Sequence, residues 1–276
     1  MIKKAVIPIA GLGTRLLPFT KSVPKEMMPI NGKPIIHYIV EEAIEAGIEE
    51  ILFIVNRHKR AVEDYFDLNF ELEAVLKEKN ELEKLKNIPK LEKKVKISYL
   101  RQAQASGSGA SVRLAKDFVQ NQFFAVLYGD DLFEKNALKQ VIKVHQKTNA
   151  SVLAVKEITE NKQEFYGIVE SEDQKLKQFF EKPKKNETLS CHASLGRYIL
   201  SPNIFEEIKG EYVGGQEVML TTAFERLMKK EDFYICEIEG NHYDTGNLID
   251  YTKAVIDFAL KDETMKQEIK KHIKTR

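Results

Sequence analysis

The sequence predicts an α/β fold with a mixed, mostly parallel central sheet flanked by helices. Short runs of strand-forming residues alternate with helical patterns through the first half, which is typical of parallel strands covered on both faces. Strands dominate the second half, which predicts mixed sheet laid against the first. Hydrophobic residues make up 43% of the 276 residues, enough for a substantial core. Ligands should bind beyond the carboxyl ends of the strands.

The first half begins with an apolar run over residues 5–9, which predicts a strand ending in a loop of small residues. Apolar residues then recur at helical spacing over 35–44, and Gly47 is typical of a helix end. Residues 71–94 are densely charged but keep an apolar stripe, which predicts a solvated helical excursion. Further strands are predicted at 51–55, 95–100 and 123–128.

The second half continues the same sheet and ends in helices. Residues 261–276 mix basic and acidic side chains and predict an exposed final helix. We expect a single domain over residues 1–276, divided into 1–150, 151–260 and this tail. Strands are predicted at 151–156, 167–170, 176–180 and 193–200, and helices at 203–209, 218–228 and 248–260.

The composition indicates which partners and which cellular location to expect. The 43 Lys and Arg residues nearly balance the 42 Asp and Glu residues, so neither a nucleic acid nor a membrane surface is expected as the main partner. No apolar run reaches about 18 residues. Cys191 and Cys236 are too few for a disulfide framework and are expected to be reduced. The protein is predicted to be soluble and cytoplasmic.

The loop after the first strand is the strongest candidate for phosphate binding. Small residues at Ala10, Gly11, Gly13 and Thr14 let backbone N–H groups approach a phosphate, and Arg15 adds a permanent positive charge. A tight turn before a helix is the alternative interpretation.

Two common nucleotide-binding motifs do not fit this loop. It lacks the Gly-Lys-Ser/Thr ending of a Walker loop, and Leu16 stands where a dinucleotide fingerprint has its third glycine. The next strand is followed by Asn56 and Arg57, without the acidic residue that would bind a ribose. Hydride chemistry is therefore not expected.

The loop and the segment after it resemble a known family. Ala-Gly-Leu-Gly-Thr-Arg at 10–15 and Pro-Lys-Glu-Met-Met-Pro at 24–29 are similar to the signature of the sugar nucleotidyltransferases, particularly the bacterial UTP–glucose-1-phosphate uridylyltransferases. The resemblance extends from Lys4 to about Leu260. It implies a Rossmann-like nucleotide-diphospho-sugar transferase fold, with a nucleotide-binding half over 1–150 and a sugar-binding half over 151–260.

The resemblance also implies a reaction and a site. The enzyme would use Mg²⁺ to make UDP-glucose and pyrophosphate from UTP and glucose 1-phosphate, and it would form a homodimer or homotetramer. The implied catalytic residues are Arg15, Lys25 and Lys182; the nucleotide-binding residues are Ala10, Gly11, Gly13, Thr14, Gln102 and Gly107; the sugar-binding residues are Gly167, Glu181 and Lys182; the metal ligands are Asp130 and Asp244.

Read alone, several of these residues have other interpretations. Gln102 can donate and accept as a pyrimidine requires, but a segment of this composition is more often a flexible turn. Asp130 and Asp131 suit Mg²⁺ or a helix N-cap, or Asp130 could bind the metal while Asp131 caps a helix. Asp244 could be a turn residue, and the turn around Lys182 could be merely solvated.

Departures from the family pattern leave alternative functions open. Changes at Ala105, Ser106 and Ala110 permit dTTP, in a thymidylyltransferase, or a different sugar phosphate. The second alternative is a sugar-nucleotide-binding regulatory protein without turnover, motivated by Asn247 and by other substitutions. These other substitutions are Gln216 and Met219, in a segment that begins at Gly214 and Gly215.

Overall fold

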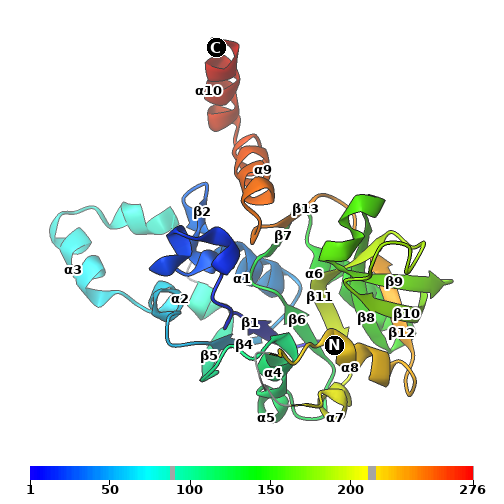
Figure 1. The fold of residues 1–276 in the computed structure, drawn as a ribbon. Helices are drawn as coiled ribbons and strands as arrows, with labels where there is room; N and C mark the ends of the chain where they lie inside the picture. The colour runs from blue at the N-terminus through cyan, green and yellow to red at the C-terminus, as the bar shows by residue number, and fades with distance from the viewer. Residues whose placement is uncertain (88–90, 211–215, 276) are drawn as a thin grey trace.

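One nine-stranded sheet forms the centre of the protein, with its strands in the order β5-β4-β1-β6-β11-β8-β12-β10-β9 (Figure 1). The computed structural model describes residues 1–87, 91–210 and 216–275. The strands of this sheet are β1 (Lys4–Pro8), β4 (Glu50–Val55), β5 (Lys96–Arg101), β6 (Phe124–Leu127), β8 (Ser151–Glu157), β9 (Gly167–Glu172), β10 (Lys175–Glu181), β11 (His192–Leu200) and β12 (Phe233–Glu237).

Strand direction differs between the two parts of this sheet. Strands β5, β4, β1 and β6 are parallel, so their carboxyl ends lie at one edge. Strand β11 is antiparallel to both β6 and β8, and β10 is antiparallel to both β12 and β9. The predicted α/β class with a mixed sheet and flanking helices is confirmed, and parallel pairing prevails only in the first part.

The two faces of the sheet bury alternate side chains, as the period of a strand requires. In β1, Ala5 and Ile7 face one apolar core, whereas Val6 faces the other. Helices α1 (Ile35–Glu45), α2 (Arg60–Phe66) and α6 (Ala137–Thr148) cover the first face. The second face is covered by α4 (Ser108–Arg113), α5 (Lys116–Val119), α7 (Ile204–Glu207) and α8 (Thr221–Leu227).

Most predicted elements form, but two helices are shorter than predicted and several strands are additional. The helix predicted at 218–228 begins only at Thr221, because the Val218 backbone hydrogen-bonds to Ser106 and Gly109 instead. The helix predicted at 203–209 is shorter. Strand β12 and a two-stranded ribbon of β7 (Asp131–Phe133) and β13 (His242–Asp244) are additional elements that the sequence pattern did not reveal.

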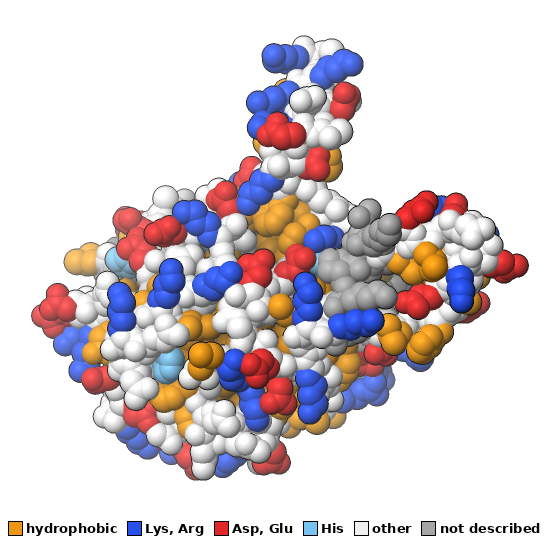
Figure 2. All heavy atoms as spheres, turned by 180° about the vertical axis from the view of Figure 1, so that it is seen from behind, with side chains coloured by type: hydrophobic (Ala, Val, Ile, Leu, Met, Phe, Trp, Pro, Cys, Tyr) orange, Lys and Arg blue, Asp and Glu red, His pale blue; other side chains and the backbone are white. Residues whose placement is uncertain are grey.

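Exposed helices occur in two places, the charged segment 71–94 and the C-terminal tail. Helix α3 (Phe70–Glu78) and the 3₁₀ turns η4 (Leu82–Asn87) and η5 (Leu91–Lys93) form the described part of the excursion predicted at 71–94, of which residues 88–90 lie outside the described residues. Helix α9 (Leu248–Ala259) leads into α10 (Glu263–Lys274), which projects away from the body and has no buried residue (Figure 1). Figure 2 shows an apolar patch at the base of this projection and interspersed charges over the face in view. Among the described residues, no helix has the length and apolarity needed to cross a membrane.

Candidate active site

The glycine loop lies at the carboxyl end of β1 and is fixed from two sides. The Asn56 side chain donates a hydrogen bond to the Ala10 carbonyl at 2.6 Å. The Thr20 hydroxyl donates to the Gly13 carbonyl at 2.8 Å. Gly13 has φ +71°, a left-handed conformation that favours glycine. The loop is thus an ordered backbone turn, with Gly11 and Thr14 exposed beside Arg15.

Two cations and two carboxylates meet beyond the ends of β1 and β6. Arg15 Nη1 lies 2.8 Å from the Asp244 carboxylate, and its Nη2 lies 3.9 Å from Asp130. Lys25, in the short 3₁₀ turn η3 (Lys25–Met27), forms an ion pair with Asp130. The structure therefore brings together the implied catalytic residues Arg15 and Lys25 and both implied metal ligands.

The β7–β13 ribbon explains how Asp244 reaches a residue more than a hundred positions earlier. Strand β13 pairs with β7 so that Asp244 lies opposite Asp131. Beyond the ribbon, the Thr245 backbone N–H and hydroxyl both donate to the Asp130 carbonyl, at 2.9 and 2.6 Å. A β-carbon on Gly246 would lie 2.4 Å from Arg15, 2.9 Å from the Asp244 carboxylate and 3.0 Å from Asp130. Only glycine leaves room there, and the two carboxylates face the same small space.

The charges of this cluster shift one another's pKa values. Burial alone would lower the pKa of Lys25, but Asp130 and Glu26 outweigh it and raise the pKa above its ordinary value. Burial would raise the pKa of Asp130, yet Lys25 and Arg15 keep it below its usual range. Asp244 differs, because its burial together with nearby Asp131 raises its pKa despite Arg15. Lys25 and Asp130 are therefore held in their charged forms.

The carboxylates of Asp130 and Asp244 fit a hard divalent cation such as Mg²⁺. This ion prefers oxygen ligands, usually takes one or two carboxylates from the protein, and completes its shell with water and phosphate oxygens. No group of three or more His, Cys, Asp or Glu side chains suited to a metal occurs in the described part of the chain. A two-carboxylate site matches the open coordination of a nucleotide-bound ion.

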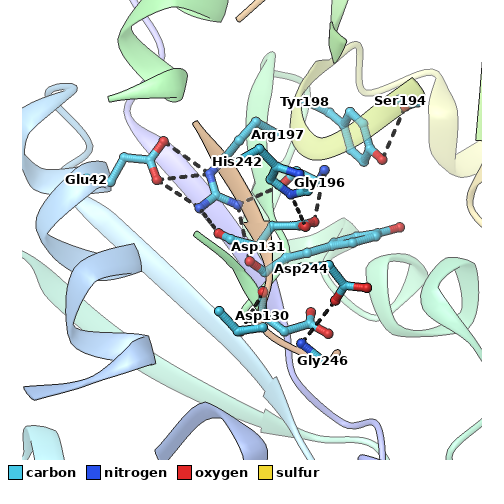
Figure 3. A network of polar contacts seen from close by, with 12 residues as sticks. Glu42, Asp130, Asp131, Ser194, Gly196, Arg197, Tyr198, His242, Asp244 and Gly246 are labelled. Carbon is cyan, nitrogen blue, oxygen red and sulfur yellow. Dashed lines mark hydrogen bonds and ion pairs between the residues drawn. The ribbon is translucent and has the colours of Figure 1, made fainter. Parts of the chain in front are cut away.

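Asp131 is committed to a buried network (Figure 3). Its carboxylate accepts a hydrogen bond from the Gly196 N–H at 3.1 Å and contacts His242 Nε2 at 2.6 Å. Arg197 donates to the Asp131 carbonyl at 2.7 Å and forms a forked ion pair with Glu42. Asp131 begins β7, so the interpretation of this residue as a helix N-cap was wrong.

The predicted sugar-binding residues line a cavity of about 730 Å³ that is also lined by Arg15, Asp130 and Asp244. Gly167 begins β9, and Glu181 ends the neighbouring β10. A β-carbon on Gly167 would lie 2.4 Å from the Phe179 ring and 3.5 Å from the Glu181 carboxylate, so glycine brings these two strands close together. Lys182 follows with φ +47°, an uncommon conformation for a side-chain-bearing residue.

The predicted base-reading residues do not line this cavity, although Ser108 beside them does. Gln102 is buried, accepts a hydrogen bond from the Ser111 hydroxyl at 2.5 Å and donates to Ser106 at 3.1 Å. Gly107 has φ +98°, and a β-carbon there would lie 2.6 Å from the Val218 carbonyl. The segment is thus an ordered turn whose glutamine is engaged by its own serines.

Other residues that depart from the family pattern have structural roles or lie in the same segment as residues outside the described part of the chain. Asn247 caps α9, accepting a hydrogen bond from the Ile249 N–H at 2.8 Å. Met219 lines the cavity. The predictions for Gly214 and Gly215 fall outside the described residues.

Sequence reasoning missed several polar residues at the site. Lys162 and Lys253 line the cavity from two separate segments and belong to none of the quoted motifs. Thr245 fixes Asp130 through its backbone and hydroxyl, a role that only the ribbon reveals. The adjacency of Thr245 to Asp244 was the one available signal.

Comparisons with known proteins identify the family of this chain. Residues 4–260 match the family model described as nucleotidyl transferase. A UTP–glucose-1-phosphate uridylyltransferase from Staphylococcus epidermidis is 44% identical over 281 residues, covering 99% of this chain and 98% of the relative. A UTP-bound UGPase from Acinetobacter baumannii superposes with a TM-score of 0.90 at 34% identity over 99% of each chain. A UDP-glucose pyrophosphorylase complexed with UDP-glucose gives a TM-score of 0.85 at 35% identity, covering 95% of this chain and 100% of the other. The chain therefore belongs to the nucleotidyl transferase family.

Proposed function

We propose that the protein transfers UMP from UTP to glucose 1-phosphate, giving UDP-glucose and pyrophosphate. One observation carries the proposal: a single cavity joins the Arg15, Asp130 and Asp244 cluster to Glu181 and Lys182. A site for anions thereby faces a site for a polyhydroxylated acceptor. The names of the similar proteins, one bound to UTP and another to UDP-glucose, support these substrates.

The reaction requires little covalent help from the protein. A phosphate oxygen of glucose 1-phosphate forms a bond to the α-phosphorus of UTP while the bond to the bridging oxygen of pyrophosphate breaks. The second pKa of a phosphate monoester is about 6, so the attacking oxygen is largely ionised at neutral pH and no general base is needed. The main obstacle is repulsion between two anions.

The cationic side chains reduce this repulsion at three places. Arg15, exposed beside the glycine loop, stabilises the departing pyrophosphate. Lys25, held charged by Asp130, stabilises the α-phosphate. Lys182 attracts the phosphate of the acceptor, and Glu181 accepts hydrogen bonds from sugar hydroxyls. Each role is electrostatic or positional.

Asp130 and Asp244 would bind one Mg²⁺, which when bound neutralises charge on the reacting phosphates. In the structure Lys25 and Arg15 neutralise these carboxylates. With the ion held by these carboxylates, Lys25 and Arg15 would be available to the phosphates.

A pyrophosphate-release assay over a matrix of nucleotides and sugar 1-phosphates tests the proposal. The pair of UTP and glucose 1-phosphate should give the highest kcat/KM. A higher value with dTTP or with another sugar phosphate would assign the neighbouring activity instead. No release with any pair, together with measurable UDP-glucose binding, would favour the regulatory alternative.

The proposed assembly is a homo-oligomer formed through α10. This helix has no buried residue and presents Met265 and Ile273, which are 40% and 66% exposed. An amphipathic helix of this kind gains stability by burying its apolar stripe against a partner. Light scattering should show two or four chains per particle for the full-length protein. Truncation after Asp262 should reduce that number. A monomeric full-length chain would refute this assembly. The cytoplasmic location stays a prediction.

A further inference from the structure

The loop between β4 and α2, residues 56–59, contacts two of the elements that face the phosphates. Asn56 binds the glycine loop through the Ala10 carbonyl. Three residues later, Lys59 Nζ donates to the Glu26 carboxylate at 2.6 Å. Lys59 is 3% exposed and Glu26 is completely buried. An ion pair so far from water is uncommon and needs a reason, because both charges lose their hydration.

The negative charge of the buried Glu26 carboxylate is compensated by its hydrogen bond from the Lys59 ammonium group. Its Oε2 accepts from Lys59, while its Oε1 has no hydrogen-bond partner among the described residues. Burial lowers the pKa of Lys59, and the neighbouring charge of Glu26 opposes this shift. A buried carboxylate with one cationic partner is strongly oriented by that partner.

Glu26 in turn is the immediate neighbour of Lys25 in η3. This turn has only three residues, so fixing the Glu26 side chain fixes the direction in which Lys25 leaves the backbone. Helix α2, which Lys59 precedes, packs against η3. A β-carbon on Gly129 would lie 3.4 Å from Glu26 Cγ, so the segment carrying Asp130 also packs on this side chain. Lys25 and Asp130, the two partners of the site ion pair, therefore share one buried support.

We propose that the buried Glu26–Lys59 ion pair is a positioning element that aims Lys25 at the reacting phosphate. The inference rests on the proposed nucleotidyl transfer. Lys59 touches neither substrate nor the reacting atoms, and it acts through Glu26 and the η3 turn. Loss of the pair should lower turnover while leaving the binding of glucose 1-phosphate nearly unchanged.

The test compares Lys59→Met, Lys59→Arg and a control, Lys230→Met. Lys230 pairs with Glu207, another buried glutamate, but it lies outside the cavity. Rates are divided by the folded fraction from circular dichroism. Lys59→Met should lower kcat by about 100-fold, the size expected when a catalytic group moves by about 1 Å. Its KM for glucose 1-phosphate should stay within about threefold, because the substitution removes no contact that binds this substrate equally in the ground state and the transition state. Lys59→Arg should recover part of kcat, and Lys230→Met should keep the wild-type value.

A double variant, Glu26→Met with Lys59→Met, separates positioning from folding. Replacing both members of a buried pair by apolar residues removes the uncompensated charge, so the melting temperature should return toward that of the wild type. The kcat should nevertheless remain at least about 10-fold low, because the directional contact is absent. Wild-type kcat in the folded double variant, or in folded Lys59→Met, would overturn the proposal. Absence of turnover in the wild type would instead refute the proposed function.

Discussion

Two charged networks lie on either side of the Asp130–Asp131 peptide, and they use their charges differently. On one side, Asp130 joins Lys25, Arg15 and Asp244 at a cavity. On the other side, Asp131, which also lines this cavity, joins the fully buried Arg197 and its partners (Figure 3). The two adjacent aspartates thus belong to different networks. We call the network of Asp130, Lys25, Arg15 and Asp244 the open network, and that of Asp131, Arg197 and Glu42 the closed network.

The difference lies in how many partners each cation has. Arg197 donates to both oxygens of Glu42 and to the backbone carbonyls of Tyr128, Gly196 and Asp131. Arg15 is 61% exposed on its side chain and keeps donors available toward the cavity. Saturated hydrogen bonding is what fixes a fold, whereas available donors beside a cavity are what a phosphate site requires. Stability should therefore depend on the closed network and turnover on the open one.

The largest expected effect comes from breaking the closed network. Arg197→Met leaves the Glu42 carboxylate, which is only 9% exposed, without its cation. The free energy of unfolding should fall by about 3–5 kcal/mol, as is usual when one member of a buried pair is removed. Urea denaturation measures this loss. A fall of less than about 1 kcal/mol would mean that the network does not carry the stability assigned to it.

The next effect comes from the open network. Lys25→Ala should lower kcat by about 10²–10³-fold, because a preorganised charge at the reacting phosphorus is removed. The melting temperature should change much less than in Arg197→Met. Steady-state kinetics and a thermal melt on the same sample check both parts. A variant that loses stability but keeps kcat would reverse the assignment.

Lys182→Ala should give a smaller change of another kind. The lost charge belongs to the acceptor's phosphate, so KM for glucose 1-phosphate should rise by about 10-fold while KM for UTP is nearly constant. Lys184→Ala, two residues further along the same exposed turn, is the matched control. An increase confined to KM for UTP would place Lys182 on the nucleotide side.

The smallest effect is a gain in stability at Asp244. Because its pKa is raised in the folded protein, ionisation of this carboxyl above the ordinary range near pH 4 opposes folding. Asp244→Asn in EDTA should therefore stabilise the fold at pH 7.5 by about 1 kcal/mol or less, with no gain at pH 3 where both states are protonated. Thermal melts at the two pH values measure the difference. A loss at pH 7.5 would show that the Arg15 pair outweighs burial.

The sequence predicted the fold class and most elements because strand and helix periodicity are local. The helix at 35–44 and the strand at 51–55 are close to the observed α1 and β4. The loop at 10–15 and Asp130 could be located for the same reason, since both directly follow predicted strands. Spacing within a short segment is visible without knowledge of the fold.

The pairings between distant segments could not be predicted from local periodicity, although the family resemblance implied that Asp130 and Asp244 act together. The β7 and β13 strands have three residues each, too few for a period, yet their register brings Asp244 to Asp130. Lys59 and Glu26 are charged residues in unremarkable surroundings, and only the packing of α2 against η3 shows that they are buried together. Gln102 was expected to face a base, but Ser106 and Ser111 engage its amide.

The most direct test of the open network is a double-mutant cycle at Asp130 and Asp244, with turnover measured across a Mg²⁺ titration. If both carboxylates act through one ion, Asp130→Asn and Asp244→Asn should each lower kcat by about 10²–10³-fold and raise the Mg²⁺ concentration for half-maximal rate. The double variant should then lose little more than the worse single variant. Losses that multiply fully, with an unchanged Mg²⁺ requirement, would show that the two residues do not share a cation.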